Sequence, residues 1–219
     1  MTPKLYFGDR NYSSWSMRPW LALKWAGIAF DEEMLEIRTA PGPRAPHILA
    51  VSPSGRVPAL HIDGGVIYDS WAICEWAYEQ NNALWPADPI ARALGRSAVG
   101  EMHSGFPDLR NTLPMNFRRR EKTPLDLTEA AARDVARVFA LWQDLRTRFG
   151  ARGDFLLGPR SIADAYYAPV ASRFITYAIE CPPAVAAYCE TIAADPAYKE
   201  WERAACEETR MIADYEVTR

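Results

Sequence analysis

Apolar residues follow two different spacings along this chain, and the change falls near residue 81. Up to that point, short apolar runs alternate with turn residues, which predicts strands at 4–7 and 30–37 and a helix between them from about 16 to 26. Beyond it, apolar residues recur every three or four positions and strand-like runs almost disappear. The pattern therefore predicts a small α/β unit followed by an all-helical one.

The stretch after the second strand is broken by turn residues. Residues 38–53 contain four prolines, so we expect a loop there with at most one helical turn. Val57–Leu60 predicts a strand that Pro58 must begin, because proline has no N–H to give to a sheet. The Asp-Gly-Gly turn at 63–65 suits a tight hairpin with a strand at 66–68.

A helix is predicted directly after this hairpin. Ser70, preceded by Asp69, is a favourable N-cap for a helix over 71–80. The free N–H groups at the start of a helix attract anions. This helix start is therefore a candidate site for a negatively charged group.

Five helices are predicted in the second part, at 89–113, 128–149, 161–177, 183–194 and 196–212. Pro107 should kink or break the first of them, because an internal proline removes a helical hydrogen bond. Ser161 and Asp164 form an S-x-x-D capping signature at the start of the third. We interpret these two residues as folding residues, not catalytic ones.

The composition narrows the class of protein. The chain has 219 residues, 49% of them hydrophobic and 24% charged, and its net charge of −3 does not favour a nucleic acid partner. No run is long and apolar enough to predict a membrane span or a signal peptide. Four scattered cysteines and three dispersed histidines predict reduced thiols in a cytoplasmic protein, with no disulfide frame and no metal site.

The hairpin and cap around Val57-Pro58 and Asp69-Ser70 resemble the glutathione-binding half of the cytosolic glutathione transferases. In that family the Val-Pro bond is cis, and the valine backbone pairs with the cysteinyl part of glutathione. A side chain at the Asp69 position and a serine hold the γ-glutamyl group. The family usually has Glu or Gln there, so Asp69 is a mild departure.

The resemblance covers the whole chain, since an all-helical domain also follows the α/β domain in this family. It implies a thioredoxin-like glutathione-binding domain at 1–80, a linker at 81–87, and an all-α domain at 88–219 that contributes the electrophile pocket. It also implies a homodimer.

Such an enzyme must keep a bound thiol ionised, and a hydroxyl donor at a helix N-terminus can stabilise the thiolate. Residues 13–23, SSWSMRPWLAL, resemble the zeta-class motif S-S-C-S-x-R-x-R-x-A-L and, more loosely, the serine enzymes of the theta and tau classes. Ser13 takes the position of the catalytic serine, and Ser14, which follows it, is the second candidate for that role. Either serine could instead simply cap the helix. Tyr6 and Tyr12 are rival hydroxyls, and we rank Tyr6 below Ser13.

The motif also departs from the zeta class. Trp15 replaces the zeta cysteine and Trp20 replaces the second arginine. Both replaced residues belong to the maleylacetoacetate isomerase signature, so their loss argues against that activity, and the missing cysteine disfavours thiol transfer. Trp15 fits either core packing or a wall of the electrophile pocket. Arg18 fits either a buried ion pair or a ligand contact.

Further candidates come from the same resemblance. Arg56 could reach a glutathione carboxylate or be a solvated loop residue, and His47 could bond the glycyl end. Four residues of the second domain are candidate electrophile contacts, although their spacing also fits core packing: Met102, His103, Phe106 and Met115. The basic run 118–120 is interpreted as a solvated helix end, and the alternative is that it receives an acidic substrate.

We therefore predict a serine-type glutathione transferase, zeta- or theta-like, in which Ser13 activates the co-substrate glutathione for addition to a small electrophile, as in detoxification. The alternative within the class is a glutathione-dependent cis–trans isomerase of the maleylacetoacetate type. The alternative from another class is a non-catalytic binding or regulatory protein on the same scaffold. Such a protein would need neither a hydroxyl at the first helix nor the acidic-Ser cap.

Overall fold

The computed structural model describes residues 2–39, 45–121 and 125–216. A four-stranded mixed sheet forms its first part, in the strand order β2-β1-β3-β4. β1 (Lys4–Gly8) runs parallel to β2 (Asp31–Leu35) and antiparallel to β3 (Ala59–Ile62). β3 also pairs antiparallel with β4 (Gly65–Tyr68). This is the predicted thioredoxin-like arrangement.

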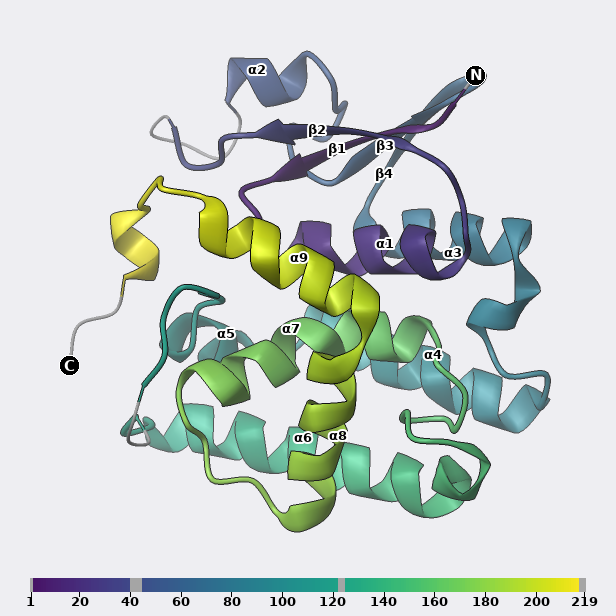
Figure 1. Cartoon of the computed structure of the whole chain (residues 1–219), viewed down its shortest axis with the longest axis vertical. Coiled ribbons are helices and arrows are strands. Elements are labelled where there is room, and N and C mark those ends of the chain that lie inside the picture. The colour runs from purple at the N-terminus through teal and green to yellow at the C-terminus, as the bar shows by residue number, and fades with distance from the viewer. Residues whose placement is uncertain (1, 40–44, 122–124, 217–219) are drawn as a thin grey trace.

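Three helices accompany the sheet: α1 (Ser14–Trp25), α2 (Pro46–Leu49) and α3 (Ser70–Gln80). α1 connects the two parallel strands, as a crossover must. Figure 1 shows α1 and α3 side by side between the sheet and the later helices, with α2 at the outer end of the molecule. α1 is therefore covered from both sides, and residues 16–23 are all buried.

Strand boundaries differ from the predicted ones. β2 covers only part of 30–37, because β1 offers it five pairing positions, from Lys4 to Gly8. β3 begins at Ala59, so Pro58 lies just before the strand instead of opening it. Within the predicted loop at 38–53, α2 is the single helical turn expected there, and residues 40–44 lie outside the described residues.

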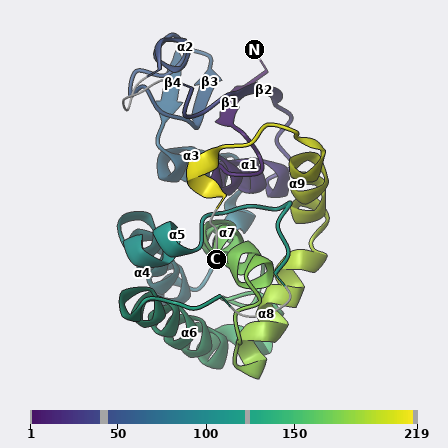
Figure 2. The ribbon, with the colours of Figure 1, turned by 90° about the vertical axis from the view of Figure 1, so that its left-hand side faces the viewer.

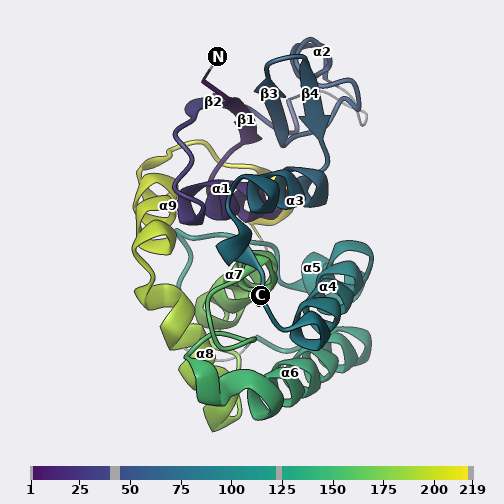
Figure 3. The ribbon, with the colours of Figure 1, turned by 90° about the vertical axis from the view of Figure 1, so that its right-hand side faces the viewer.

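The remaining helices are α4 (Pro89–Ser104), α5 (Pro107–Thr112), α6 (Glu129–Phe149), α7 (Ile162–Thr176), α8 (Pro183–Ala194) and α9 (Pro196–Glu207). Short 3₁₀ turns cover Asn82–Leu84, Gly150–Arg152 and Ala213–Tyr215. Figures 2 and 3 show α4 to α8 at the end of the molecule opposite the sheet, while α9 returns beside α1. The all-helical second part is thus as predicted.

Two helix predictions concern breaks. The helix predicted at 89–113 is divided before Pro107, as expected, and Phe106 takes a left-handed φ of 58° between the two pieces. The helix predicted at 196–212 ends earlier, at Glu207. The Glu208 carboxylate accepts hydrogen bonds from the backbone N–H groups of Arg10 and Asn11. After this tertiary contact, residues 208–212 form neither helix nor strand.

α7 passes through the centre of the hydrophobic core and packs against α1, α4 and α8. The capping box at its start is present, and the Asp164 carboxylate accepts the Ser161 N–H at 2.8 Å. The same carboxylate accepts bonds from the Leu156 N–H and the Tyr188 hydroxyl. α7 therefore presents fixed side chains to the N-terminal end of α1, where the candidate site lies.

Candidate functional site

Ser13 stands at the N-cap of α1, directly after the loop that leaves β1. Its side chain makes no capping hydrogen bond to the helix backbone and instead donates to the Ser16 hydroxyl at 2.7 Å. Ser16 also accepts the Gly8 N–H at 3.0 Å. The simple capping role considered for Ser13 is thus not what its hydroxyl does here. Gly8 leaves room for this arrangement, because a Cβ there would lie 2.6 Å from Ile37 and 3.2 Å from Ser13.

Ser13 lines a cavity of about 350 Å³, which we call the thiol cavity. A second cavity of about 450 Å³, the cap cavity, is lined by Asp69, Ser70 and His103. Trp15, Arg56 and Val57 line both cavities. The two cavities are thus adjacent and meet at these three residues.

The Val57-Pro58 peptide bond, whose valine lines both cavities, is cis, as the resemblance implies. Among the described residues, the backbone groups of Val57 take part in none of the hydrogen bonds found outside the helices and strands. An unpaired N–H and C=O next to a strand can accept an extended ligand as an added strand. Val57 is therefore placed for backbone pairing between the Ser13 and Asp69 ends of the site.

Asp69, and not Ser70, is the N-cap of α3, which corrects the predicted cap. Its Oδ1 accepts the Trp71 N–H at 2.7 Å, and its φ of 108° is strained for a residue with a side chain. Ser70 becomes the first helical residue, and its buried hydroxyl lies 3.0 Å from the Tyr166 hydroxyl of α7. One carboxylate oxygen and one hydroxyl thus converge at the start of α3.

The predicted electrophile contacts separate into two groups. Trp15 and His103 line the cap cavity, with ring centroids 5.2 Å apart. Met102, Phe106 and Met115 are buried in the hydrophobic core and line neither of the two cavities. The core alternative weighed for these three side chains therefore describes their environment.

His47 and Tyr6 lie away from both cavities. The His47 imidazole bonds the Glu36 carbonyl oxygen at 2.9 Å, and the Tyr6 ring packs against His61. Neither residue lines the thiol cavity or the cap cavity. Arg56 does line both, which favours a ligand contact over a solvated loop position.

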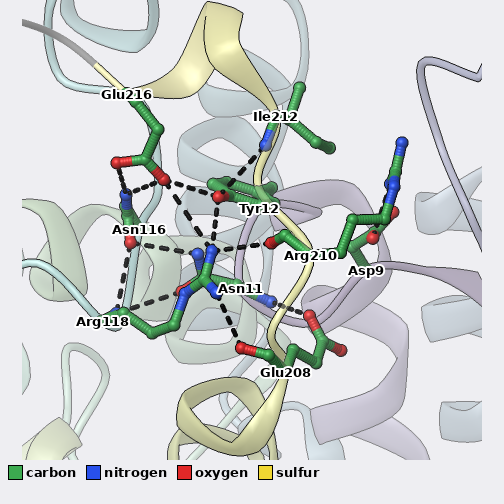
Figure 4. A network of polar contacts seen from close by, with 9 residues as sticks. All are labelled: Asp9, Asn11, Tyr12, Asn116, Arg118, Glu208, Arg210, Ile212 and Glu216. Atoms are coloured by element: carbon green, nitrogen blue, oxygen red, sulfur yellow. Dashed lines mark hydrogen bonds and ion pairs between the residues drawn. The ribbon is translucent and has the colours of Figure 1, made fainter.

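Tyr12, the other rival hydroxyl, belongs to a network that ties the chain after α9 to the loop before α1 (Figure 4). Its hydroxyl donates to Glu216 at 2.6 Å and accepts bonds from Arg118 and from the Ile212 N–H. Arg210 forms an ion pair with the buried Asp9 at 2.7 Å. The Tyr12 hydroxyl is therefore committed to structure.

Arg118 corrects the interpretation of the basic run 118–120 as a solvated helix end. Its guanidinium donates to the carbonyl oxygens of Glu208 and Arg210 as well as to Tyr12. The chain after α9 also brings Tyr215 into the wall of the thiol cavity, with its ring 5.5 Å from that of Tyr12. Sequence reasoning missed Tyr215, because a contact made by the last turn of the chain leaves no local pattern.

Positive charge accumulates under Trp15. The guanidinium of Arg18 is fully buried between the rings of Trp15 and Tyr166, and none of its nitrogens has a hydrogen-bond partner among the described residues. Arg110 also faces the Trp15 ring and donates only to backbone carbonyl oxygens. Arg173 donates to two carbonyl oxygens and lies 3.4 Å from the Ser14 hydroxyl.

Both fully buried arginines have depressed pKa values. Burial lowers the pKa of Arg18 to about 10, and burial together with the charges of Arg110 and Arg18 lowers the pKa of Arg173 to about 9. In the described part of the chain, the ion pairs of the structure include none of these three arginines with a carboxylate. An anion near the first turn of α1 would meet an uncompensated positive potential.

We also searched the described residues for a metal site and for a membrane-spanning helix. The described residues contain no group of three or more His, Cys, Asp or Glu side chains arranged to hold an ion. Within the described ranges, no helix has the length and apolar character needed to cross a membrane.

The chain is similar in sequence to known proteins. Residues 12–80 match the family model described as glutathione S-transferase, N-terminal domain. The chain is 31% identical to a maleylacetoacetate isomerase of Pseudomonas aeruginosa over 209 residues, which covers 90% of this chain and 94% of the relative. It is 30% identical to a zeta-class glutathione S-transferase of Euphorbia esula, over 80% of this chain and 77% of the relative.

Solved structures show the same fold. A glutathione transferase homolog from Burkholderia, solved with bound glutathione, superposes with a TM-score of 0.72 at 23% identity, covering 95% of this chain and all of that one. A theta-class glutathione S-transferase from Xanthomonas axonopodis pv. citri, also with glutathione bound, gives a TM-score of 0.67 at 24% identity, over 91% and 96% of the two chains.

Proposed function

Because the chain belongs to the glutathione S-transferase family, we propose that it binds glutathione, ionises its thiol and adds the thiolate to a small electrophile. The observation that carries this proposal is the meeting of the two cavities at Val57. Glutathione would lie along them with its γ-glutamyl group at Asp69 and Ser70, its cysteinyl backbone on Val57, and its sulfur beside Ser13.

Ser13 is the proposed thiolate donor. In the free protein its hydroxyl proton is held by Ser16, so it must rotate toward the sulfur when glutathione binds. The buried arginines around Trp15 and the N-terminus of α1 add positive potential that favours a thiolate. Arg56 is proposed to pair with a glutathione carboxylate, since it lines both cavities.

The test is an ultraviolet difference titration of glutathione into the wild type and into Ser13→Ala as the pH is lowered. We expect a thiolate absorbance near neutral pH in the wild type, where free glutathione is mostly protonated. Ser13→Ala should keep binding but require a higher pH for that absorbance. Ser14→Ala is the matched control, because the Ser14 hydroxyl contacts Arg173 at 3.4 Å and lines neither cavity.

Each other outcome assigns the role differently. An unchanged absorbance in Ser13→Ala with a loss in Ser14→Ala would move the role to Ser14. Absence of glutathione binding by the wild type would contradict the enzyme function and leave the non-catalytic binding protein as the explanation. Binding without an ionised thiol would do the same.

A glutathione-dependent isomerase is the second candidate, and the similarity to the Pseudomonas maleylacetoacetate isomerase favours it. In that reaction the thiolate would add to a double bond, allow rotation and leave again. Trp15 stands where the isomerase signature has cysteine, so activity toward maleylacetoacetate itself is the deciding assay. Turnover without net consumption of glutathione would identify the isomerase.

The proposed assembly is a cytoplasmic homodimer, as the family resemblance implies. Light scattering coupled to size-exclusion chromatography would measure the mass in solution. A mass close to that of one 219-residue chain would contradict the dimer.

A further inference from the structure

His103 connects the helical part of the protein to the start of α3. It lies in the last turn of α4 and lines the cap cavity. Its Nε2 is 3.4 Å from the Asp69 Oδ2, and its Nδ1 is 3.3 Å from the Tyr166 hydroxyl. The imidazole therefore has one polar group on each side, drawn from two different helices.

A chain of hydrogen-bonding groups continues beyond Tyr166. The Tyr166 hydroxyl lies 3.0 Å from the Ser70 hydroxyl, which is itself buried. The polar contacts run from Asp69 to His103, then to Tyr166 and finally to Ser70. Because Asp69 and Ser70 are neighbours in the sequence, the four side chains form an open ring. The ends of this ring, the Asp69 carboxylate and the Ser70 hydroxyl, are the two groups proposed to hold the γ-glutamyl part of glutathione.

The surroundings of His103 favour its neutral imidazole form. Burial lowers its pKa, and although Asp69 raises it, the nearby guanidinium groups of Arg18 and Arg110 lower it further. The Tyr166 hydroxyl also keeps its proton, since burial raises the pKa of Tyr166 well above its usual value. A neutral imidazole has one N–H donor and one acceptor nitrogen, so its two sides must play opposite parts.

The neutral ring can hold its protons in two arrangements. In one, the Nε2–H of His103 donates to Asp69, Nδ1 accepts the Tyr166 proton, and Tyr166 accepts the Ser70 proton. This arrangement suits the free protein but leaves the Ser70 hydroxyl proton turned toward Tyr166 and away from a ligand. In the other, Nδ1–H donates to Tyr166, Tyr166 donates to Ser70, and the Ser70 proton is free for a carboxylate.

The second arrangement places the bare Nε2 of His103 opposite the bare Oδ2 of Asp69. Two acceptors 3.4 Å apart repel each other unless a donor lies between them. The α-ammonium group of a γ-glutamyl residue supplies several N–H donors next to the α-carboxylate that Ser70 would receive. The amino-acid end of the ligand thus satisfies both ends of the ring at once.

We infer that His103 and Asp69 together bind the α-ammonium of the γ-glutamyl group, and that Tyr166 directs the Ser70 hydroxyl to the α-carboxylate. The imidazole proton moves from Nε2 to Nδ1 by exchange with solvent, so binding takes up no net proton. His103 is then a glutathione-binding residue of the helical part, and not the electrophile contact that the sequence suggested. This inference rests on the proposed binding of glutathione.

The experiment compares two ligands that differ only in the α-ammonium. Glutathione and glutaryl-cysteinylglycine, which lacks that group, are titrated by calorimetry into the wild type, His103→Phe and His61→Phe. His103→Phe should weaken the binding of glutathione about tenfold, the size expected for the loss of one hydrogen bond to a charged group. The affinity for the analogue should stay within about twofold of the wild-type value. His61→Phe is the matched control, because His61 lines neither cavity.

Equal weakening of both ligands by His103→Phe would make the residue merely structural and overturn the inference, as would no change at all. Failure of the proposed function looks different, because the wild type would then bind neither ligand. Tyr166→Phe provides a second test. It should weaken glutathione binding and leave binding of the analogue within about twofold, because with the analogue the ring keeps the arrangement in which the Ser70 proton points to Tyr166. Binding of cysteinylglycine should stay unchanged.

Nitrogen-15 NMR of the His103 ring shows directly which of its two nitrogens carries the proton. A His103 variant is needed only to assign the signal. We expect the ring to be protonated at Nε2 in the free protein and at Nδ1 with glutathione bound, but to stay at Nε2 with glutaryl-cysteinylglycine. The same tautomer in all three samples would overturn the inference.

Discussion

The guanidinium carbon of Arg18 lies 4.2 Å from the ring centroid of Trp15, three residues earlier on the same helix. The same carbon lies 4.6 Å from the Tyr166 ring centroid, so the charge is in contact with two aromatic rings. Cation–π contacts replace only part of the hydration that a buried guanidinium loses. Arg18 therefore costs folding free energy while it places positive charge beneath Trp15, which lines both cavities.

Replacing Arg18 by methionine should raise stability and weaken thiol ionisation. Arg18→Met keeps the length of the side chain but removes a buried charge without a carboxylate partner, so we expect the free energy of unfolding to rise by about 1 kcal/mol or more. The pKa of bound glutathione should rise in the same variant, because the thiolate loses a nearby cation. Urea unfolding and the ultraviolet titration measure the two effects.

Arg133→Met is the control for this variant, because Arg133 forms an exposed i,i+4 pair with Glu129 on α6. Its effect on unfolding should stay within about 0.5 kcal/mol. A destabilised Arg18→Met whose bound thiol keeps the wild-type pKa would show that Arg18 has a packing role alone.

Removing the Tyr12 hydroxyl should destabilise the protein without changing the thiol. Tyr12→Phe removes the hydroxyl donor to Glu216 at 2.6 Å, one of the acceptors of Arg118, and the acceptor of the Ile212 N–H. We expect a loss of about 1–3 kcal/mol in the free energy of unfolding, the cost of unsatisfied polar groups. Tyr6→Phe should have little effect, since the Tyr6 ring contact with His61 remains. A raised pKa of bound glutathione in Tyr12→Phe would contradict the assignment to Ser13.

The succession of strands and helices in the first part, the position of α1 and the break before Pro107 could all be predicted from sequence because each depends on neighbouring residues. Strand alternation, the proline at 58 and the cap at 69–70 are local signals. The same holds for the pairing of Ser161 with Asp164. Local signals also placed Ser13 at a helix start, but not the direction of its hydroxyl toward Ser16, which depends on Gly8 bringing the strand end close.

Contacts between distant segments were not predictable in this way. Tyr166 belongs to an aromatic, alanine-rich helix pattern that predicts burial, and nothing in that pattern indicates its bonds to Ser70 and His103. Arg118 looked like a solvated charge because its acceptors, the carbonyl oxygens after α9, lie about ninety residues away in sequence. The charge and hydropathy pattern around a residue indicates whether its own helix or strand is buried at that position. The roles of Tyr166 and Arg118 depend instead on which distant segments pack against them.

Adding a methyl group at Gly8 should disturb Ser13 more than it disturbs the fold. In Gly8→Ala the new Cβ would lie 2.6 Å from Ile37 and 3.2 Å from the Ser13 side chain, so both must move. We expect the pKa of bound glutathione to rise and turnover to fall about tenfold, because misplacing a catalytic group slows the reaction strongly. Gly64→Ala is a poor control owing to its positive φ, whereas Gly65→Ala has open space and should leave turnover unchanged. Unchanged turnover in Gly8→Ala would argue against Ser13 as the thiolate donor.

Asp164 should make stability fall as the pH rises through the mildly acidic range. Burial raises the pKa of Asp164 from 3.8 to about 6 in the folded protein. Below pH 3.8 the carboxyl is protonated in both states. Between pH 3.8 and pH 6 the folded protein keeps the proton that the unfolded chain has released. The contribution of Asp164 to the free energy of unfolding therefore decreases by about 3 kcal/mol over this range and is constant above pH 6.

The measurement is the difference in the free energy of unfolding between the wild type and Asp164→Asn across that range. From pH 4 to pH 6 the free energy of unfolding of the wild type should fall relative to that of Asp164→Asn. Relative to the exposed Asp144→Asn variant, it should show no such trend. The Asp164 carboxylate also accepts bonds from the Leu156 N–H, the Ser161 N–H and the Tyr188 hydroxyl, and these favour its ionised form. A difference that instead moves in favour of the wild type as the pH rises would mean that these bonds outweigh the cost of burial, and that the start of α7 carries a buried negative charge.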